Sequence, residues 1–326
     1  MPPKIRGMTA NLTSQTSTLK RFTLMVSGED VIDAGLEQNV PPSGLPQERF
    51  LLGDGLPIAP VLLLGQSDVS VNPNDVIACL QPVHFHATRD HLILMAQSQI
   101  DLTANESTKL LQTALPFIEE DFGSKVLFQG QRDWFISAGP FASLATHSID
   151  QAHGRNIDWW MPRDTSEIGI AKLWRKLQNE IQMLWHIDPV NEEREQRGYP
   201  SINSLWISGI GKLADLQTPQ LLENTNQIYG NHPLLSGLAK YLEIPQENEI
   251  DFSRLQNAFA WIDRPDSIWG NLSKALLNQE LHEVEIIDFP KGQARHRIFT
   301  VKDLSKKSWA FWKKSEPLTW SEVISA

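Results

Sequence analysis

The chain has 326 residues, of which 41% are hydrophobic, and this apolar content excludes an intrinsically disordered protein. A formal net charge of -10 argues against a general nucleic-acid binder, which normally presents a basic face. There is one cysteine, Cys79, so no internal disulfide can form and the chain suits a reducing cytoplasm.

The first 28 residues contain no acidic residue and are rich in Ser and Thr. We interpret residues 1–21 as a flexible leader before the first strand. The strongest apolar run, residues 57–64, is far shorter than the ~20 residues that a membrane span requires. The sequence therefore predicts a cytoplasmic protein without a membrane span.

Short apolar runs bounded by turn residues predict the strands of the first half of the chain. They are residues 22–26, 76–80, 83–86 and 91–95, followed by a hairpin of 125–128 and 133–137. Apolar residues at helical spacing predict a helix over 107–121, which Gly123 closes.

The clearest helix is expected over residues 165–185, with Asp164 as its cap and Glu167 at the capping-box spacing. A strand around Trp206 follows, and we expect Gly209 and Gly211 to form its exit turn. Further helices are expected over 218–227, 233–242 and 269–277, and further strands over 283–289 and 297–301.

Strands and helices mixed along the whole chain predict an α/β or α+β fold, with a mixed sheet flanked by helices. All eleven tryptophans lie after residue 133, and this asymmetry suggests two lobes. We divide the chain into a leader (1–21), an N-terminal α/β lobe (22–150), a C-terminal α/β lobe (151–305) and a Trp/Lys-rich tail (306–326).

Residues 178–212 are the most informative segment, because a helix end, a polar turn, a short strand and a Gly-x-Gly pair follow one another closely. Such a unit gathers polar side chains and backbone N–H groups near one place. Arginine suits bidentate binding of a carboxylate or phosphate. The candidate ligand-binding residues are His186, Asn191, Arg194, Arg197, Asn203, Ser204, Gly209 and Gly211.

The same segment also fits a structural corner. In that interpretation Asn191 caps a short helix, Arg194 and Arg197 are solvated, and the glycines permit a tight chain reversal. The sequence leaves the two interpretations equally open.

The segment resembles the RpfE-type regulatory family of bacterial proteins. The resemblance is carried by Asn179-Glu180-Ile181-Gln182-Met183-Leu184, Pro189-Val190-Asn191, Arg194, Gly198 and Asn203-Ser204-Leu205-Trp206. Further matches are Pro82-Val83-His84, Asp90, Trp134, Gly154-Arg155 and residues 308–314, so the resemblance covers nearly the whole chain.

Residues 189–211 also resemble a segment of the archaeal-type, cofactor-independent phosphoglycerate mutases, which belong to the alkaline-phosphatase-like superfamily. This resemblance implies a related α/β core, and for the family it implies two divalent metals and a nucleophilic serine. The family shows an Asp-Gly metal motif after its first strand, where this chain has Ser27-Gly28. It shows an Asp-x-x-Gly-His cluster near the end, where Asp288 and Gly292 have no histidine after them.

One further departure is Asp188, which stands where a histidine commonly precedes Pro-Val-Asn. We therefore expect no metal centre, no cofactor and no assigned catalytic residue. The predicted function is phosphoglycerate-mutase-like but non-catalytic, with a regulatory role or a small anionic ligand, or with a regulatory protein partner. The alternative is an active mutase or related metal-dependent phosphotransferase that uses Mn or Mg.

Three other features are interpreted structurally. His84 and His86 alternate on a strand near His91, a pattern that a metal site also shows, and we expect hydrogen-bonded or exposed strand histidines. Cys79 lies in an apolar run and is expected to be a buried thiol. The aromatic and basic tail, residues 309–314 with Trp320, is expected to dock on the main body rather than to bind a partner.

Overall fold

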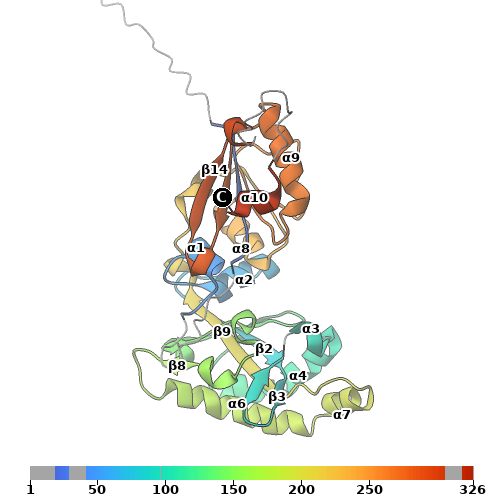
Figure 1. Cartoon of the computed structure of the whole chain (residues 1–326). Coiled ribbons are helices and arrows are strands. Elements are labelled where there is room, and N and C mark those ends of the chain that lie inside the picture. The colour runs from blue at the N-terminus through green and yellow to red at the C-terminus, as the bar shows by residue number, and fades with distance from the viewer. Residues whose placement is uncertain (1–18, 29–41, 96, 305–317, 326) are drawn as a thin grey trace, which may run out of the picture.

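The protein consists of two lobes, each built on its own sheet (Figure 1). The residues described by the computed structural model are 19–28, 42–95, 97–304 and 318–325. The six-stranded lobe consists of residues 19–28, 42–66, 213–304 and 318–325. The four-stranded lobe consists of residues 76–212. Helices flank both sheets, so the predicted mixed α/β fold class is confirmed.

The larger sheet has the strand order β11-β10-β12-β1-β13-β14, and all its neighbours are parallel except β13 and β14. The first strand of the chain lies in its middle, where Phe22 pairs with Ala258 on one side and with Val284 on the other. The strands are β1 (Arg21–Met25), β10 (Gln227–Tyr229), β11 (Gln246–Glu247), β12 (Ala258–Trp261), β13 (Glu283–Asp288) and β14 (Arg295–Phe299).

Helices cover both faces of this sheet because its central strands β1, β12 and β13 bury residues on both sides. Phe22 and Leu24 of β1 face α9 and α10, whereas Met25 faces α1, α2 and α8. The helices are α1 (Pro46–Leu52), α2 (Ile58–Gln66), α8 (Pro233–Leu242), α9 (Asp266–Leu277) and α10 (Trp320–Ser325).

The smaller sheet is antiparallel, with the order β5-β6-β2-β9. Its strands are β2 (Val76–Val83), β5 (Val126–Gln129), β6 (Trp134–Ser137) and β9 (Ser204–Lys212). Two short pairs accompany it, β3 (Phe85–Ala87) with β4 (Leu92–Leu94) and β7 (Leu144–Ala145) with β8 (Arg163–Asp164). The helices are α3 (Gln97–Ile100), α4 (Ala104–Pro116), α5 (Ile149–Ala152), α6 (Ile170–His186) and α7 (Pro189–Gln196).

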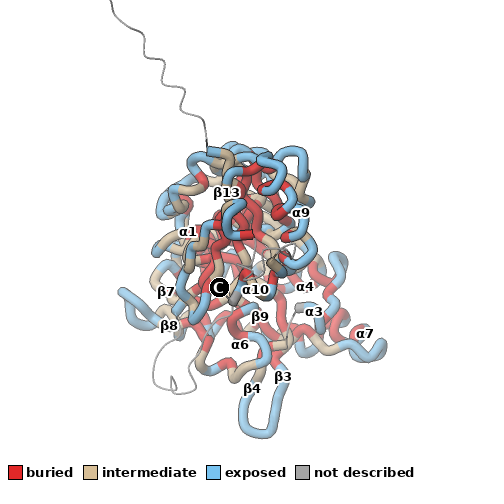
Figure 2. The backbone as a smooth tube through the Cα atoms, turned by 45° about the horizontal axis from the view of Figure 1, so that its top comes forward, coloured by how far each residue is buried: buried red, intermediate tan, exposed pale blue. Residues whose placement is uncertain are grey.

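The two faces of the smaller sheet have different partners. One face packs on α4 and α6 and buries Trp134, Trp174 and Trp185. The other face packs Cys79 and Phe135 against α2 of the larger lobe. Each lobe has its own buried core (Figure 2). The apolar contact between the smaller sheet and α2 joins the two lobes.

Strand β9 extends further than the sequence predicts. Gly209 and Gly211 do not form an exit turn, because both lie inside β9, where Gly211 pairs with Ile77 of β2. Between Ile77 and Cys79 the register shifts by one residue, and Gly209 has a φ of +66° at this bulge. A bulge lets a strand bend without leaving its sheet, so β9 continues toward the six-stranded lobe (Figure 1).

The main helices and strands match their predicted positions, with two corrections. The long helix begins at Ile170, not at 165, although Asp164 still accepts the backbone N–H groups of Gly169 and Ala171 at 2.8 and 2.5 Å. The helix expected over 218–227 is only a 3-10 turn, Gln220–Asn224, because the chain there must enter β10.

The two sheets divide the chain differently from the boundary at residue 150. The four-stranded lobe is an insertion between α2 and β10, and its sheet combines β2, β5 and β6 with β9. Residues 1–18 of the leader and 305–317 of the tail lie outside the described residues. Trp320 is 8% exposed and packs on Trp269 with ring centroids 6.0 Å apart, so this part of the tail docks on the main body as predicted.

Candidate functional site

Asn191 and Arg194, the central members of the predicted ligand set, are buried in the corner between α6, α7 and β9. Asn191 donates to the carbonyl oxygens of Trp185 and Ile202, both at 2.8 Å, and accepts from the N–H of Ile202 at 2.7 Å. The side-chain amide of Asn191 therefore forms the hydrogen bonds that these backbone groups would otherwise lack where the chain turns from α7 into β9.

Arg194 is fully buried, and its guanidinium links three segments of the lobe. It donates to the carbonyl oxygen of Pro200 at 2.9 Å, to a carboxylate oxygen of Glu106 at 2.9 Å and to the carbonyl oxygen of Ile100. Arg197, which is half exposed, donates to the other oxygen of Glu106. Burial of Glu106 disfavours its ionised form, but hydrogen bonds from Thr103 and Arg197 outweigh this and lower its pKa.

The other predicted residues lie on either side of this corner. Asn203 exchanges two hydrogen bonds with the backbone of Phe85, at 2.7 and 3.0 Å. Ser204 is buried and its hydroxyl has no partner among the described residues. His186 is exposed at the end of α6. The interpretation as a structural corner needs two corrections, because Asp188 and not Asn191 caps α7, and Arg194 is buried rather than solvated. A ligand contact by this set stays a prediction.

Gly209 and Gly211 lie apart from this corner, since Gly209 is five residues along β9 from Ser204, a distance of about 17 Å in an extended strand. A Cβ atom on Gly209 would approach the backbone nitrogen of Ala59 to 2.8 Å. One on Gly211 would approach the Cα atom of Pro57 to 2.8 Å. The glycine pair thus lets β9 pass directly against the start of α2, at the junction of the lobes.

A cavity of about 350 Å³ lies at this junction, and Gly209 lines it. Cavities of this size at the boundary between lobes are the usual location of small-molecule sites. It is lined by residues of both lobes, namely Pro42, Ser43, Gly44, Arg49, Gly53, Asp54, Gly55, Leu56, Ile58, Leu144, Ala145, Thr146, Ser148, Gly209 and Ile210.

The cavity contains polar groups with unused hydrogen-bonding capacity. Thr146 is 8% exposed, and its hydroxyl has no partner among the described residues. Arg49 donates through Nη1 to the carbonyl oxygens of Ser43 and Gly44, and its Nε and Nη2 have no partner in the described part of the chain. Ser148 accepts a bond from the backbone of Gln151 and keeps its own proton to donate. These groups are mainly donors.

A second polar group lies at the carboxyl ends of the parallel strands, where α/β sheets commonly bind ligands. Ser27, after β1, donates to Asp263, after β12, at 2.6 Å, and Trp261 donates to the Ser27 oxygen at 2.8 Å. His232, after β10, stacks on Trp261 with centroids 3.9 Å apart. Burial lowers the pKa of His232 to about 4, although the nearby Asp263 opposes this.

This group was not predicted as a site. Ser27 was noted only as a departure from the Asp-Gly motif, and His232 and Asp263 have no recognisable spacing in the sequence. The signal that would have found them is positional, since each follows an apolar strand of the same parallel sheet. Helix α1 contacts both regions, because its Gln47 accepts the N–H of Gly28 at 3.1 Å and its Arg49 lines the cavity.

The described residues at this edge do not fit a two-metal centre. Asp288, at the end of β13, binds Arg295 through both carboxylate oxygens, at 2.9 and 2.6 Å, and also binds Arg297 at 2.9 Å. A cation there would meet two guanidinium groups. In the described ranges no three His, Cys, Asp or Glu side chains come together as metal ligands.

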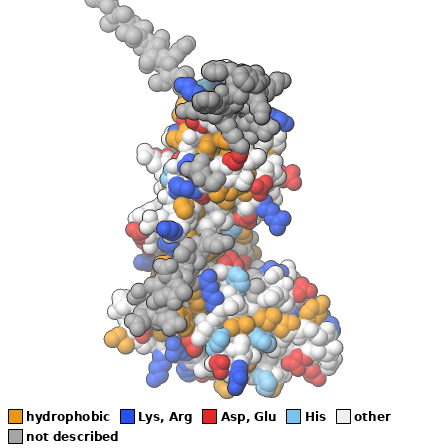
Figure 3. Space-filling model, in the orientation of Figure 1, with side chains coloured by type: hydrophobic (Ala, Val, Ile, Leu, Met, Phe, Trp, Pro, Cys, Tyr) orange, Lys and Arg blue, Asp and Glu red, His pale blue; other side chains and the backbone are white. Residues whose placement is uncertain are grey.

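Among the histidines of the four-stranded lobe, His84 donates through Nδ1–H to the carbonyl oxygen of Ser201 at 2.6 Å. Burial, with the neighbouring His86, lowers the pKa of His84 despite that bond. The two rings lie 6.0 Å apart, and His91 is exposed. Histidines are visible on this lobe in Figure 3, where acidic and basic side chains are interspersed over the face shown.

Cys79 is buried as predicted, and burial, with Asp133 nearby, raises the pKa of its thiol well above the usual value. Across the described residues, no helix combines the length and the apolar character needed to cross a bilayer.

No protein-family model matches the sequence, and no curated protein matches it with statistical significance. Solved structures with a distantly similar chain trace include the following two. The cofactor-independent phosphoglycerate mutase of Thermoplasma acidophilum is 14% identical, with a TM-score of 0.38, over 86% of this chain and 90% of its own. The PH0037 protein of Pyrococcus horikoshii is 11% identical, with a TM-score of 0.42, over 88% of this chain and 90% of its own. The similarity to phosphoglycerate-mutase-like proteins is distant.

Proposed function

We propose that this protein is a non-catalytic binding protein whose cavity between the lobes holds a small anionic molecule. The observation that carries the proposal is the lining of this cavity, where Arg49, Thr146 and Ser148 supply donors. An arginine with two neighbouring hydroxyl groups matches the oxygen atoms of a carboxylate or phosphate. Asp54 is exposed at the rim, where solvent screens its charge.

The position of the cavity supports a regulatory role. It is lined by α1 and the following loop from one lobe and by β7 and β9 from the other. A ligand bound there contacts both lobes and thereby stabilises one relative arrangement of them. We further propose that the protein is an RpfE-type regulatory protein and that it is located in the cytoplasm. Cell fractionation with an antibody against the chain tests the location.

Isothermal titration calorimetry with inorganic phosphate and 3-phosphoglycerate tests the ligand class. We expect binding by the wild-type protein and a loss of about tenfold or more in affinity for Arg49→Gln, because a charge-assisted hydrogen bond is removed. Thr146→Val, which keeps the side-chain shape, should weaken binding by a smaller factor. Arg89→Gln is the matched control, since Arg89 is exposed on the turn between β3 and β4.

Equal affinities for Arg49→Gln and Arg89→Gln would place the anion elsewhere, and no binding of either probe would refute the anionic ligand. The active-mutase alternative is favoured by one observation, the hydrogen bond from Ser27 to Asp263 at the carboxyl edge of the sheet. Turnover of 3-phosphoglycerate with added Mn²⁺ or Mg²⁺, abolished in Ser27→Ala, would establish that alternative and replace the non-catalytic proposal.

A further inference from the structure

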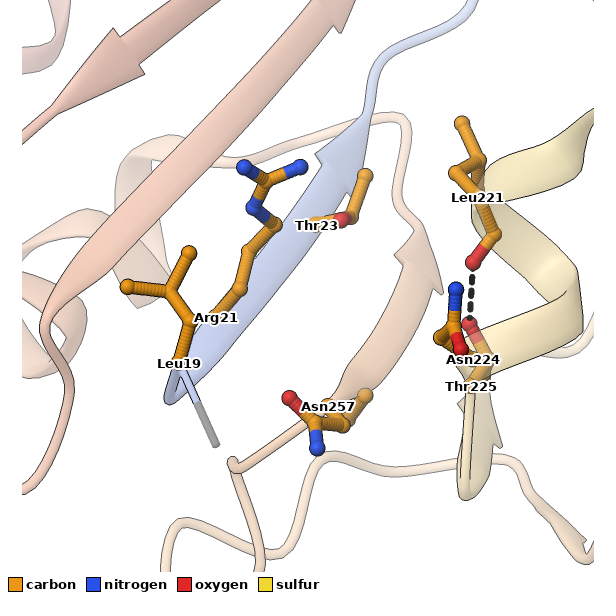
Figure 4. A pocket seen from close by; sticks show the side chains of 8 residues that line it. Leu19, Arg21, Thr23, Leu221, Asn224, Thr225 and Asn257 are labelled. Atoms are coloured by element: carbon orange, nitrogen blue, oxygen red, sulfur yellow. Dashed lines mark hydrogen bonds between the residues drawn. The ribbon is translucent and has the colours of Figure 1, made fainter. Parts of the chain in front are cut away.

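A second pocket lies at the opposite end of the six-stranded sheet, where β1 and β12 begin (Figure 4). Its volume is about 300 Å³, and it shares no residue with the cavity between the lobes. It is lined by Leu19, Arg21, Thr23, Leu221, Asn224, Thr225, Asn257 and Ala258. An adjoining pocket of about 370 Å³ shares Arg21, Leu221 and Asn224 with it and adds Phe50, Pro219, Gln220, Glu285 and His296.

The pocket exists because β1 is polar on one face at its amino end. Phe22 and Leu24 point into the core, so Arg21 and Thr23 point to the other face. Helices α1, α2 and α8 cover that face near the carboxyl ends of the strands, where Met25 and Phe259 are buried. Near the amino ends the 3-10 turn Gln220–Asn224 stands opposite β1 instead (Figure 4).

Three side chains of the pocket have polar atoms without a partner among the described residues. Thr23 is 6% exposed, and its hydroxyl forms no hydrogen bond there. The amide groups of Asn224 and Asn257 likewise form none. Asn257 is held at a φ of +54° by its backbone, which donates to the carbonyl oxygen of Arg21 at 2.7 Å and accepts from Asn226 at 2.8 Å. These groups line the pocket and can exchange hydrogen bonds with a molecule bound in it.

The charges of the pocket are already balanced. Arg21 binds Glu283 and, at 3.2 Å, Glu285, and His296 binds the other oxygen of Glu285 at 2.8 Å. An anion would therefore approach two carboxylates, and a cation would approach a guanidinium group. The remaining groups include both donors and acceptors, whereas a phosphate or carboxylate needs donors.

We propose that this pocket binds a neutral polyhydroxylated molecule, such as a monosaccharide or a cyclic polyol. A hydroxyl group donates and accepts at once, so it matches amides and a threonine hydroxyl that lack partners. Leu19, Leu221 and Ala258 supply apolar surface for the C–H face of such a ring, and Phe50 continues it in the adjoining pocket. The proposal is independent of the anion proposed for the cavity between the lobes.

Saturation-transfer NMR and calorimetry with glucose, galactose, ribose and myo-inositol test this inference. We expect at least one of them to bind with a Kd on the order of 1 mM. Thr23→Val and Asn224→Ala should each weaken that binding severalfold, up to about tenfold, because each removes one hydrogen bond. Thr23→Val keeps the shape of the side chain, and Asn224 is exposed, so both variants should keep the wild-type Tm.

Asn179→Ala is the matched control, because Asn179 is exposed on α6 in the other lobe. A sugar that binds the wild type and this control equally, and the two pocket variants more weakly, supports the inference. Failure of all four probes to bind, or equal binding by every variant, would overturn it. Inorganic phosphate that competes with the sugar would also overturn it, because it would show an anion site.

Discussion

Arg194 and Glu106 form an ion pair at 2.9 Å in which the guanidinium is fully buried and the carboxylate nearly so. The pair connects α7 to the start of α4, and three backbone carbonyls surround the same guanidinium, those of Pro200, Asp101 and Ile100. The guanidinium of Arg194 thus forms its hydrogen bonds with the protein itself. We infer that Arg194, which the sequence suggests as an anion ligand, stabilises the fold.

Replacement of Arg194 tests this role. Arg194→Ala leaves Glu106 buried with one partner fewer, and we expect the free energy of unfolding to fall by about 3–5 kcal/mol. Arg197→Ala removes a side chain that is 49% exposed from the same carboxylate, and we expect a loss below about 1 kcal/mol. Urea unfolding of both variants measures the difference. Similar losses would show that the burial of Arg194 is energetically unimportant.

Gly209 is required by both its backbone angle and its neighbours. A side chain there would be strained at a φ of +66° and would meet the backbone nitrogen of Ala59 at 2.8 Å. We expect Gly209→Ala to lower the free energy of unfolding by about 1–3 kcal/mol or more.

Gly270 provides the control for Gly209, since it lies within α9 and a Cβ atom there has no heavy atom within 4 Å. Gly270→Ala should raise stability by up to about 1 kcal/mol, because alanine is the better helix former. Chemical denaturation compares the two variants, and a stabilising Gly209→Ala would contradict the close approach of β9 to α2.

His232 makes stability depend on pH. Its pKa is about 4 in the folded protein and takes its ordinary value of 6.5 in the unfolded chain. Between these pH values the unfolded chain binds a proton that the folded protein does not, so stability falls as the pH drops from 6.5 through 4. The contribution of this group is up to roughly 3 kcal/mol.

His232→Asn isolates this effect, because asparagine can still accept the N–H of Leu234 that the imidazole accepts at 3.2 Å and so keeps the cap of α8. The variant should lose less stability than the wild type between pH 7 and pH 4.5, measured by urea unfolding. Parallel pH profiles for the two proteins would exclude His232 as the titrating group.

Cys79 should be unreactive in the folded protein. Its thiol is buried between the sheet and α2, and its raised pKa keeps it protonated at pH 8. We expect a chromogenic disulfide reagent to label it only as fast as the protein unfolds, and to label it at once in guanidinium. Fast labelling at pH 8 without denaturant would show that the contact between the lobes opens readily.

Trp320 tests the docking of the C-terminal helix. It packs on Trp269, whose indole donates to the carbonyl oxygen of Leu318 at 2.8 Å. Trp320→Ala should cost about 3 kcal/mol or more, because a large buried side chain is removed. Hydrogen exchange should rise around residues 318–325 and in α9. Unchanged exchange there would show that the segment contributes little to the lobe.

Local patterns predicted the elements well, because they depend on neighbours in sequence. The spacing of apolar residues located α8 at 233–242, and the alternation of short strands located the hairpin of β5 and β6. Docking of Trp320 was predicted because a terminal segment is ordered only when side chains anchor it on the main body. The extension of β9 through two glycines was missed, because glycine normally marks a turn and only the partner strand β2 reveals the bulge.

The sequence by itself determined the mixed α/β class and the buried thiol of Cys79, since each depends on residues near one another or on composition. The tertiary structure alone decided what the corner and the edges of the sheets can bind. Ser27 meets Asp263, and Thr23 faces Asn224, only because β1 is inserted among strands from the end of the chain. A pairing between strands so far apart in sequence leaves no periodic signal along the chain, so those contacts become visible only once the parallel sheet is formed.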